Sequence, residues 1–118
     1  MEIRYFCKNL TIDGKTLEYI EKRLTRVSRV LDRIIRIELE AELDKKGFYR
    51  LEVMIKVPRK LYRAEETSES LESSVDTVVD ELLSQIRKDK DRVREVRERG
   101  ARSIKKKMSL DKNSRFRK

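Results

Sequence analysis

Apolar residues recur at the spacing of an amphipathic helix near the N-terminus of the chain. Steps of three and four residues separate five of them, which are Leu17, Ile20, Leu24, Val27 and Leu31. This period predicts a helix of about four turns with one stripe that can be buried. The preceding loop, 9–14, ends in Asp13 and Gly14, and either residue can cap a helix that begins near Lys15.

Two runs further along the chain alternate between apolar and polar residues, which is the pattern of strands with one buried face. The first run is 35–43 and the second is 49–57. The short segment between them contains Gly47, which can adopt a positive φ. The pattern therefore predicts an antiparallel hairpin, and Pro58 ends its second strand because proline cannot donate a hydrogen bond to the ladder.

Two weaker patterns predict one further strand on either side of this hairpin. Residues 2–7 are rich in strand formers and place Cys7 on their apolar face. We expect this cysteine to be a core residue rather than a nucleophile, because no histidine is available as its base. A shorter strand is indicated at 62–66.

The longest periodic segment, 68–99, predicts one helix whose character changes halfway along. Its first half carries an apolar stripe at the helical period, formed by Leu71, Val75, Val78, Val79, Leu82, Leu83 and Ile86. Basic residues dominate its second half, where two valines alone continue the stripe. Thr67 or Ser68 is expected to cap this helix, and Gly100 is expected to end it.

The predicted elements follow one another in the order β-α-β-β-β-α, which defines an α+β fold with a four-stranded sheet. Because each helix has one apolar stripe and each strand one apolar face, we expect both helices to pack on the same face of the sheet. If the first strand neighbours the second, the helical crossover between them makes the two strands parallel. The other sheet face is expected to be exposed to solvent and too acidic to bind RNA. We therefore expect nucleic acid to bind on the helical side. The acidic residues of the other sheet face are Glu38, Glu40, Glu42 and Glu52.

Positive charge is concentrated in the last third of the chain, which has a net charge of +9. Residues 84–118 carry 15 basic and 5 acidic side chains, whereas residues 58–83 carry 3 basic and 7 acidic ones. This asymmetry favours a polyanionic partner, either RNA, DNA or anionic lipid, and among these we favour nucleic acid. We divide the chain into a domain at 1–99 and a basic, flexible tail at 100–118, because the tail has few apolar residues to anchor it.

Several classes of function lack the residues that they need. The chain contains no histidine and no glycine-rich phosphate loop, and a lone cysteine can complete neither an internal disulfide nor a zinc site. We therefore expect no enzyme, no cofactor, no metal and no small-molecule substrate. No apolar window is long enough to cross a membrane and no signal peptide begins the chain, so we expect a cytoplasmic protein. Aromatic residues make up only 6% of the chain, which favours recognition of RNA shape and backbone charge over base stacking.

Several local runs, together with the order of elements, resemble the family of ribosome hibernation-promoting factors, also called ribosome-associated inhibitors or sigma-54 modulation proteins. The matching runs are 17–24 (LEYIEKRL), 32–34 (DRI), 64–65, 68–69, 75–76 and 85–88 (QIRK) with Lys90. The resemblance covers about residues 1–95. It implies a fold similar to a double-stranded RNA-binding domain and a bacterial protein of the cytoplasm.

The same resemblance implies a function and a set of contact residues. It implies binding to the small ribosomal subunit in the channel used by tRNA and mRNA, which blocks translation under starvation, stress or stationary phase. By position, the residues implied to contact 16S rRNA are Lys22, Arg23, Arg87, Lys88 and Lys90. Basic charge and helical facing add Arg26, Arg29, Arg92, Arg94, Arg97, Lys105, Lys106 and Lys107. The last three could also be read as a localisation signal, which we favour less than a phosphate contact.

Two other functions fit the same sequence. A general RNA- or DNA-binding chaperone would act through its basic tail, so deletion of 101–118 would abolish binding. A protein-interaction module, such as a modulator of a transcription factor, would use its basic end only for solubility, and its binding would be insensitive to salt. Long members of the family carry a second domain that pairs two ribosomes. This sequence ends at Lys118, so we expect either a short form or one that acts with a separate dimerisation factor, with ribosomal proteins as further partners.

Overall fold

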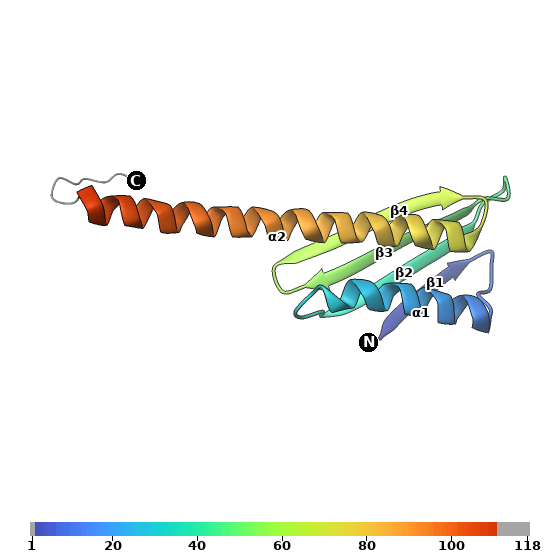
Figure 1. Cartoon of the computed structure of the whole chain (residues 1–118). Coiled ribbons are helices and arrows are strands. Elements are labelled where there is room, and N and C mark those ends of the chain that lie inside the picture. The colour runs from blue at the N-terminus through green and yellow to red at the C-terminus, as the bar shows by residue number, and fades with distance from the viewer. Residues whose placement is uncertain (1, 111–118) are drawn as a thin grey trace. The chain divides into compact units, whose positions relative to one another are not determined.

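The computed structural model describes residues 2–110, and the side chains of residues 2–99. Four strands and two helices follow one another in the predicted order (Figure 1). The strands are β1 (Ile3–Lys8), β2 (Arg36–Leu43), β3 (Tyr49–Val57) and β4 (Lys60–Ser68). The helices are α1 (Gly14–Arg29) and α2 (Leu71–Leu110). The fold is therefore α+β, as the hydrophobic pattern predicts.

The four strands form one sheet in the order β1-β2-β3-β4. β1 runs parallel to β2, with Ile3 opposite Ile37, because the chain crosses over through α1 before it enters β2. β2 and β3 form the predicted antiparallel hairpin, in which Ile37 lies opposite Ile55. Gly47 has a φ of 87° in the turn between them, where a side chain would be strained. The predicted topology is confirmed.

One hydrophobic core lies between the sheet and the helices. The strands bury their alternating apolar residues, such as Leu39, Val53 and Ala64. The helices bury most of the stripes that their spacing predicts, namely Ile20, Leu24, Val27, Leu71, Val75, Val78, Val79, Leu82 and Ile86. The other predicted members, Leu17, Leu31 and Leu83, are only partly buried. Both α1 and residues 71–86 of α2 therefore cover the same face of the sheet (Figure 1). We refer to the opposite face, which carries the alternate side chains of the strands, as the outer face.

Three local predictions are wrong, each for a physical reason. β4 is nine residues long rather than five, because it pairs with β3 along its whole length. Thr67 and Ser68 therefore belong to the sheet and do not cap α2. Ser70 caps it instead, since its hydroxyl accepts a hydrogen bond of 3.1 Å from the Ser73 N–H. Cys7 is exposed rather than buried, because β1 lies at the edge of the sheet.

Helix α2 contributes to two compact units of the chain, Met1–Ile86 and Arg87–Lys118. The helix continues through Gly100 to Leu110, so the prediction that this glycine ends it is wrong. A single glycine costs a helix only about 1 kcal/mol relative to alanine, which its neighbours can offset. Residues 111–118 of the predicted tail lie outside the described residues, and the domain boundary after residue 99 stays a prediction.

Candidate nucleic-acid interface

Helix α1 exposes three of the cations that the sequence predicts as rRNA contacts. The Asp13 carboxylate caps the helix by accepting a hydrogen bond of 2.8 Å from the Thr16 N–H, as predicted. Because the apolar stripe of α1 faces the core, the helical period turns Lys22, Arg26 and Arg29 outward, and all three are exposed. This surface offers N–H donors and positive charge to a phosphate.

Arg23, the fourth basic residue predicted on α1, lies against α2. Its Nε is 3.1 Å from Asp76 Oδ1 and its Nη2 is 3.9 Å from Asp80 Oδ1, and only 20% of its side chain is exposed. The Tyr19 hydroxyl donates a hydrogen bond of 2.5 Å to the same Asp76 oxygen. This hydrogen bond is the main cause that raises the pKa of Tyr19, with burial and the charge of Asp76 adding to it. Arg23 therefore links two helices and has less charge to offer a ligand than its exposed neighbours.

Residues 87–99 of α2 form a charged segment in which every basic side chain is exposed. The predicted cations in it are Arg87, Lys88, Lys90, Arg92, Arg94 and Arg97. Arg92 lies 2.9 Å from Asp89 and Arg94 lies 3.5 Å from Asp91, each about one helical turn away. Ion pairs at this helical spacing support a helix by about 0.2–0.5 kcal/mol each. The side chains of the predicted Lys105, Lys106 and Lys107 lie outside the described residues. The cations of 87–99 and those of α1 belong to different compact units.

On the outer face of the sheet, Arg50 lies among four glutamates. Arg50 Nη2 lies 2.5 Å from Glu40 Oε1, and Nη1 lies 2.6 Å from Glu65 Oε2. Glu42 is 3.2 Å from Arg50 Nε, and Glu52 is 3.9 Å from Nη1 with only 9% of its side chain exposed. The hydrogen bond to Glu40 is the largest of the causes that raise the pKa of Arg50. The carboxylates of this face are therefore held together by a cation at their centre.

Basic residues also occupy the outer face away from Arg50. Arg36 on β2 lies directly opposite Lys56 on β3, and Arg4 shares their face on β1. The prediction of an acidic face is therefore wrong for this part of the sheet. The signal was present in the strand pattern, because alternate residues of each strand lie on one face and these three positions alternate with apolar ones.

Two features are absent from the described part of the chain, a metal site and a membrane-spanning helix. None of the groups of acidic or cysteine side chains in that part of the chain is arranged to hold a metal ion. No described helix combines the length and the apolar character that a membrane crossing requires. What the described surface offers chemically is positive charge on exposed helical positions and on one part of the sheet.

Known proteins resemble this chain in sequence and in fold. The ribosome hibernation promotion factor of Deinococcus radiodurans is 29% identical over 97 residues, which cover 79% of this chain. The same match covers 51% of that relative, so the chain spans about half of its length. The N-terminal domain of Protein Y from Thermus thermophilus superposes with a TM-score of 0.66 at 30% identity, covering 75% of this chain and 98% of that one.

A second solved structure supports the fold alone, because its sequence is more distant. A ribosomal subunit interface protein from Coxiella burnetii has a TM-score of 0.70 at 24% identity and covers 77% of this chain and 99% of its own. Residues 3–94 match the family described as sigma 54 modulation protein / S30EA ribosomal protein, which confirms the resemblance seen in the sequence. With most of its length in that match and a β-α-β-β-β-α fold shared with the solved relatives, the chain belongs to the sigma 54 modulation protein / S30EA ribosomal protein family.

Proposed function

We propose that this chain is a ribosome-associated hibernation factor that binds the small ribosomal subunit through 16S rRNA. By occupying the channel used by tRNA and mRNA, it would block translation during starvation or stress. The observation that carries the proposal is the family match over residues 3–94 of a chain whose described helices expose many cations. A relative named as a ribosome hibernation promotion factor adds support.

The proposed contacts are electrostatic. Lys22, Arg26 and Arg29 on α1 face solvent, as do the cations between Arg87 and Arg99 on α2. Each phosphate that a cation neutralises releases condensed counterions, so affinity for the ribosome should fall steeply as salt rises. Arg23 is expected to contribute less, because Asp76 already neutralises part of its charge.

Co-sedimentation with isolated small ribosomal subunits at low salt tests this proposal. Two variants reverse three charges each, K22E/R26E/R29E on α1 and R87E/K88E/K90E on α2. A matched control, K15E/K45E/K46E, reverses three exposed lysines at the start of α1 and in the β2–β3 turn. We expect the control to remain in the subunit fraction, whereas the other two variants should be lost from it.

Three outcomes would contradict the proposal. If all variants co-sediment like the wild type, the helical cations do not carry the binding. If deletion of residues 101–118 abolishes binding while the helix variants bind normally, a chaperone that acts through its tail explains the data better. If binding to a protein partner persists unchanged at high salt, the chain is a protein-interaction module.

A further inference from the structure

Three cations gather at the end of the outer face where α1 leads into β2. Arg36 and Lys56 lie directly opposite each other in the register of β2 and β3, and Arg4 lies on the same face of β1. Like charges placed directly opposite each other destabilise a sheet. Among the described residues, the ion pair that this group makes is between Arg36 and Glu38, at 3.4 Å. We name Arg4, Arg36 and Lys56 the sheet corner.

The sheet corner continues the basic surface of α1 along the chain. Helix α1 ends at Arg29, and β2 begins at Arg36. Arg33 lies exposed in the loop between them, beside an exposed Asp32 that reduces the local charge. Exposed cations therefore follow one another from the helical side of the sheet to its outer face.

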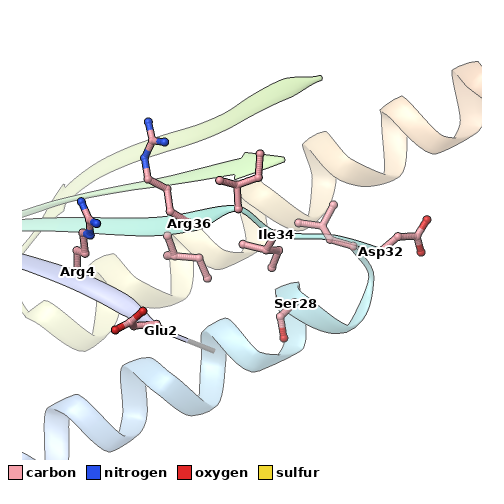
Figure 2. Close-up of a pocket in the computed structure, with 9 residues that line it drawn as sticks. Glu2, Arg4, Ser28, Asp32, Ile34 and Arg36 are labelled. Carbon is pink, nitrogen blue, oxygen red and sulfur yellow. The ribbon is translucent and has the colours of Figure 1, made fainter. Parts of the chain in front are cut away.

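A surface hollow of about 440 Å³ lies along this path, between the end of α1 and the starts of β1 and β2. Ile34 and Ile35 give it an apolar wall, and Ile35 is 54% exposed. Arg4 and Arg36 also line it, and both point to the side of the sheet away from α1, whereas the Glu2 carboxylate lies on the α1 side (Figure 2). The lining of the hollow thus combines the guanidinium groups of Arg4 and Arg36 and apolar side chains with the carboxylates of Glu2 and Asp32.

We propose that the sheet corner binds the phosphodiester backbone of an RNA strand. The inference deepens the proposed function, on which it rests, by adding an RNA contact on the outer face of the sheet. The planar guanidinium groups of Arg4 and Arg36 suit phosphate, because each can donate two parallel hydrogen bonds to its oxygens. A phosphate shared by Arg36 and Lys56 also removes the repulsion between them. The glutamates around Arg50 confine the strand to this end of the face.

The slope of binding affinity against salt concentration tests the inference. We would measure the affinity of the wild type and of R4Q/R36Q/K56Q for a labelled oligouridylate and for isolated small ribosomal subunits. Each measurement is repeated over a series of KCl concentrations. A matched control, K8Q/K45Q/K46Q, removes three exposed lysines from the opposite end of the sheet. Each phosphate contact on a single strand contributes about 0.7 to the slope of log K against log salt. We expect the corner variant to lower the slope by about 2 and the control to leave it within about 0.5.

An unchanged slope in the corner variant would overturn the inference, and so would an equal loss in the control, since total charge would then explain it. Binding of the same variants to vesicles of phosphatidylglycerol tests whether the sheet corner serves an anionic lipid surface. If the corner variant loses the vesicles but keeps the oligouridylate, the corner serves a lipid surface and the inference fails.

Two further measurements distinguish a loss of RNA binding from a loss of folding. R4Q/R36Q/K56Q removes the repulsion between Arg36 and Lys56 together with the ion pair between Arg36 and Glu38, so the free energy of unfolding in urea should stay close to the wild-type value. The charge-preserving variant R4K/R36K should keep the wild-type salt slope. If the wild type fails to bind small subunits while the corner variant still lowers the slope on oligouridylate, the proposed function fails and the RNA contact stands.

Discussion

Replacement of Arg50 by methionine tests whether the outer face depends on its central cation. Methionine keeps much of the length and apolar volume of the arginine stem but removes all five donors. In the wild-type protein these donors reach Glu40, Glu42 and Glu65 within 3.2 Å, with Glu52 at 3.9 Å. The variant would leave these four carboxylates facing one another. Arg63, which pairs with Glu52, would be the nearest remaining cation on β4.

The magnitude follows from distance and exposure. Two carboxylates about 6 Å apart repel by about 3 kcal/mol at an effective dielectric constant of about 20. Exposure weakens this repulsion, because 46% of the Glu40 side chain and 47% of the Glu65 side chain meet solvent. Glu42 and Glu52 are less exposed, at 24% and 9%, so their repulsion is screened less. Breaking an exposed ion pair costs at most about 1 kcal/mol, whereas breaking a buried one costs about 3–5 kcal/mol. Because Arg50 lies between these cases, we expect Arg50→Met to lower the free energy of unfolding by about 2–3 kcal/mol.

Urea unfolding at pH 7 measures this loss, and in a domain of this size the melting temperature should fall by about 10–20 °C. The matched control is Lys56→Met, which removes a cation from the same face of β3 and should not destabilise, because Lys56 faces Arg36. Part of the loss in Arg50→Met should return near pH 4, where glutamates take up protons. A loss below about 0.5 kcal/mol, or an equal loss in Lys56→Met, would refute the reasoning.

Two further predictions concern the contacts between the helices and the core. The raised pKa of Tyr19, due first to its hydrogen bond with Asp76, means that the folded state holds the phenolic proton more tightly than the unfolded state. The stabilisation from this hydrogen bond is complete below about pH 10 and is lost as the pH rises through the raised pKa. Tyr19→Phe should therefore reduce the fall of the urea midpoint at alkaline pH. An unaltered fall would contradict this prediction. Leu82→Ala truncates a fully buried side chain and should cost about 2–5 kcal/mol in urea unfolding, whereas Val93→Ala, at a position 49% exposed, should cost less than about 1 kcal/mol; similar losses would contradict the predicted core.

Most of the fold could be predicted because both helices and the central hairpin show a strong periodic contrast between apolar and polar residues. The alternating runs at 35–43 and 49–57 correspond to β2 and β3 within one residue at each end. A shift of one residue would turn every buried side chain to the outer face, so the pattern also determined the register. The parallel pairing of β1 with β2 followed from the handedness and reach of a helical crossover.

The features that were missed depend on contacts between residues far apart in the chain. The position of the α2 cap depends on how far β4 pairs with β3, which no local signal at Thr67 or Ser68 reveals. The exposure of Cys7 depends on β1 being an edge strand rather than on its own alternation. Gly100 weakens a helix by too little to end it when its neighbours favour helix.

The candidate interface was predictable in part, for the same reason. The exposure of Lys22, Arg26 and Arg29 follows from the helical period of α1 alone. The partial burial of Arg23 does not, because Asp76 lies on another helix. To predict that Arg36 lies opposite Lys56, the register of the two strands must be known. A count of charges along the chain gives only the average charge of the outer face and does not locate its basic part.

Because β1 pairs in parallel with β2, it cannot join the sheet as soon as it is synthesised. During synthesis its six residues precede those of α1, and their partners in β2 follow only after the whole of α1 has been made. The hairpins β2–β3 and β3–β4, by contrast, close between neighbours in the chain as soon as both strands exist. β1 can therefore enter the sheet only after α1 has been made and β2 has followed it, and until then Cys7 lies on an unpaired segment of the nascent chain.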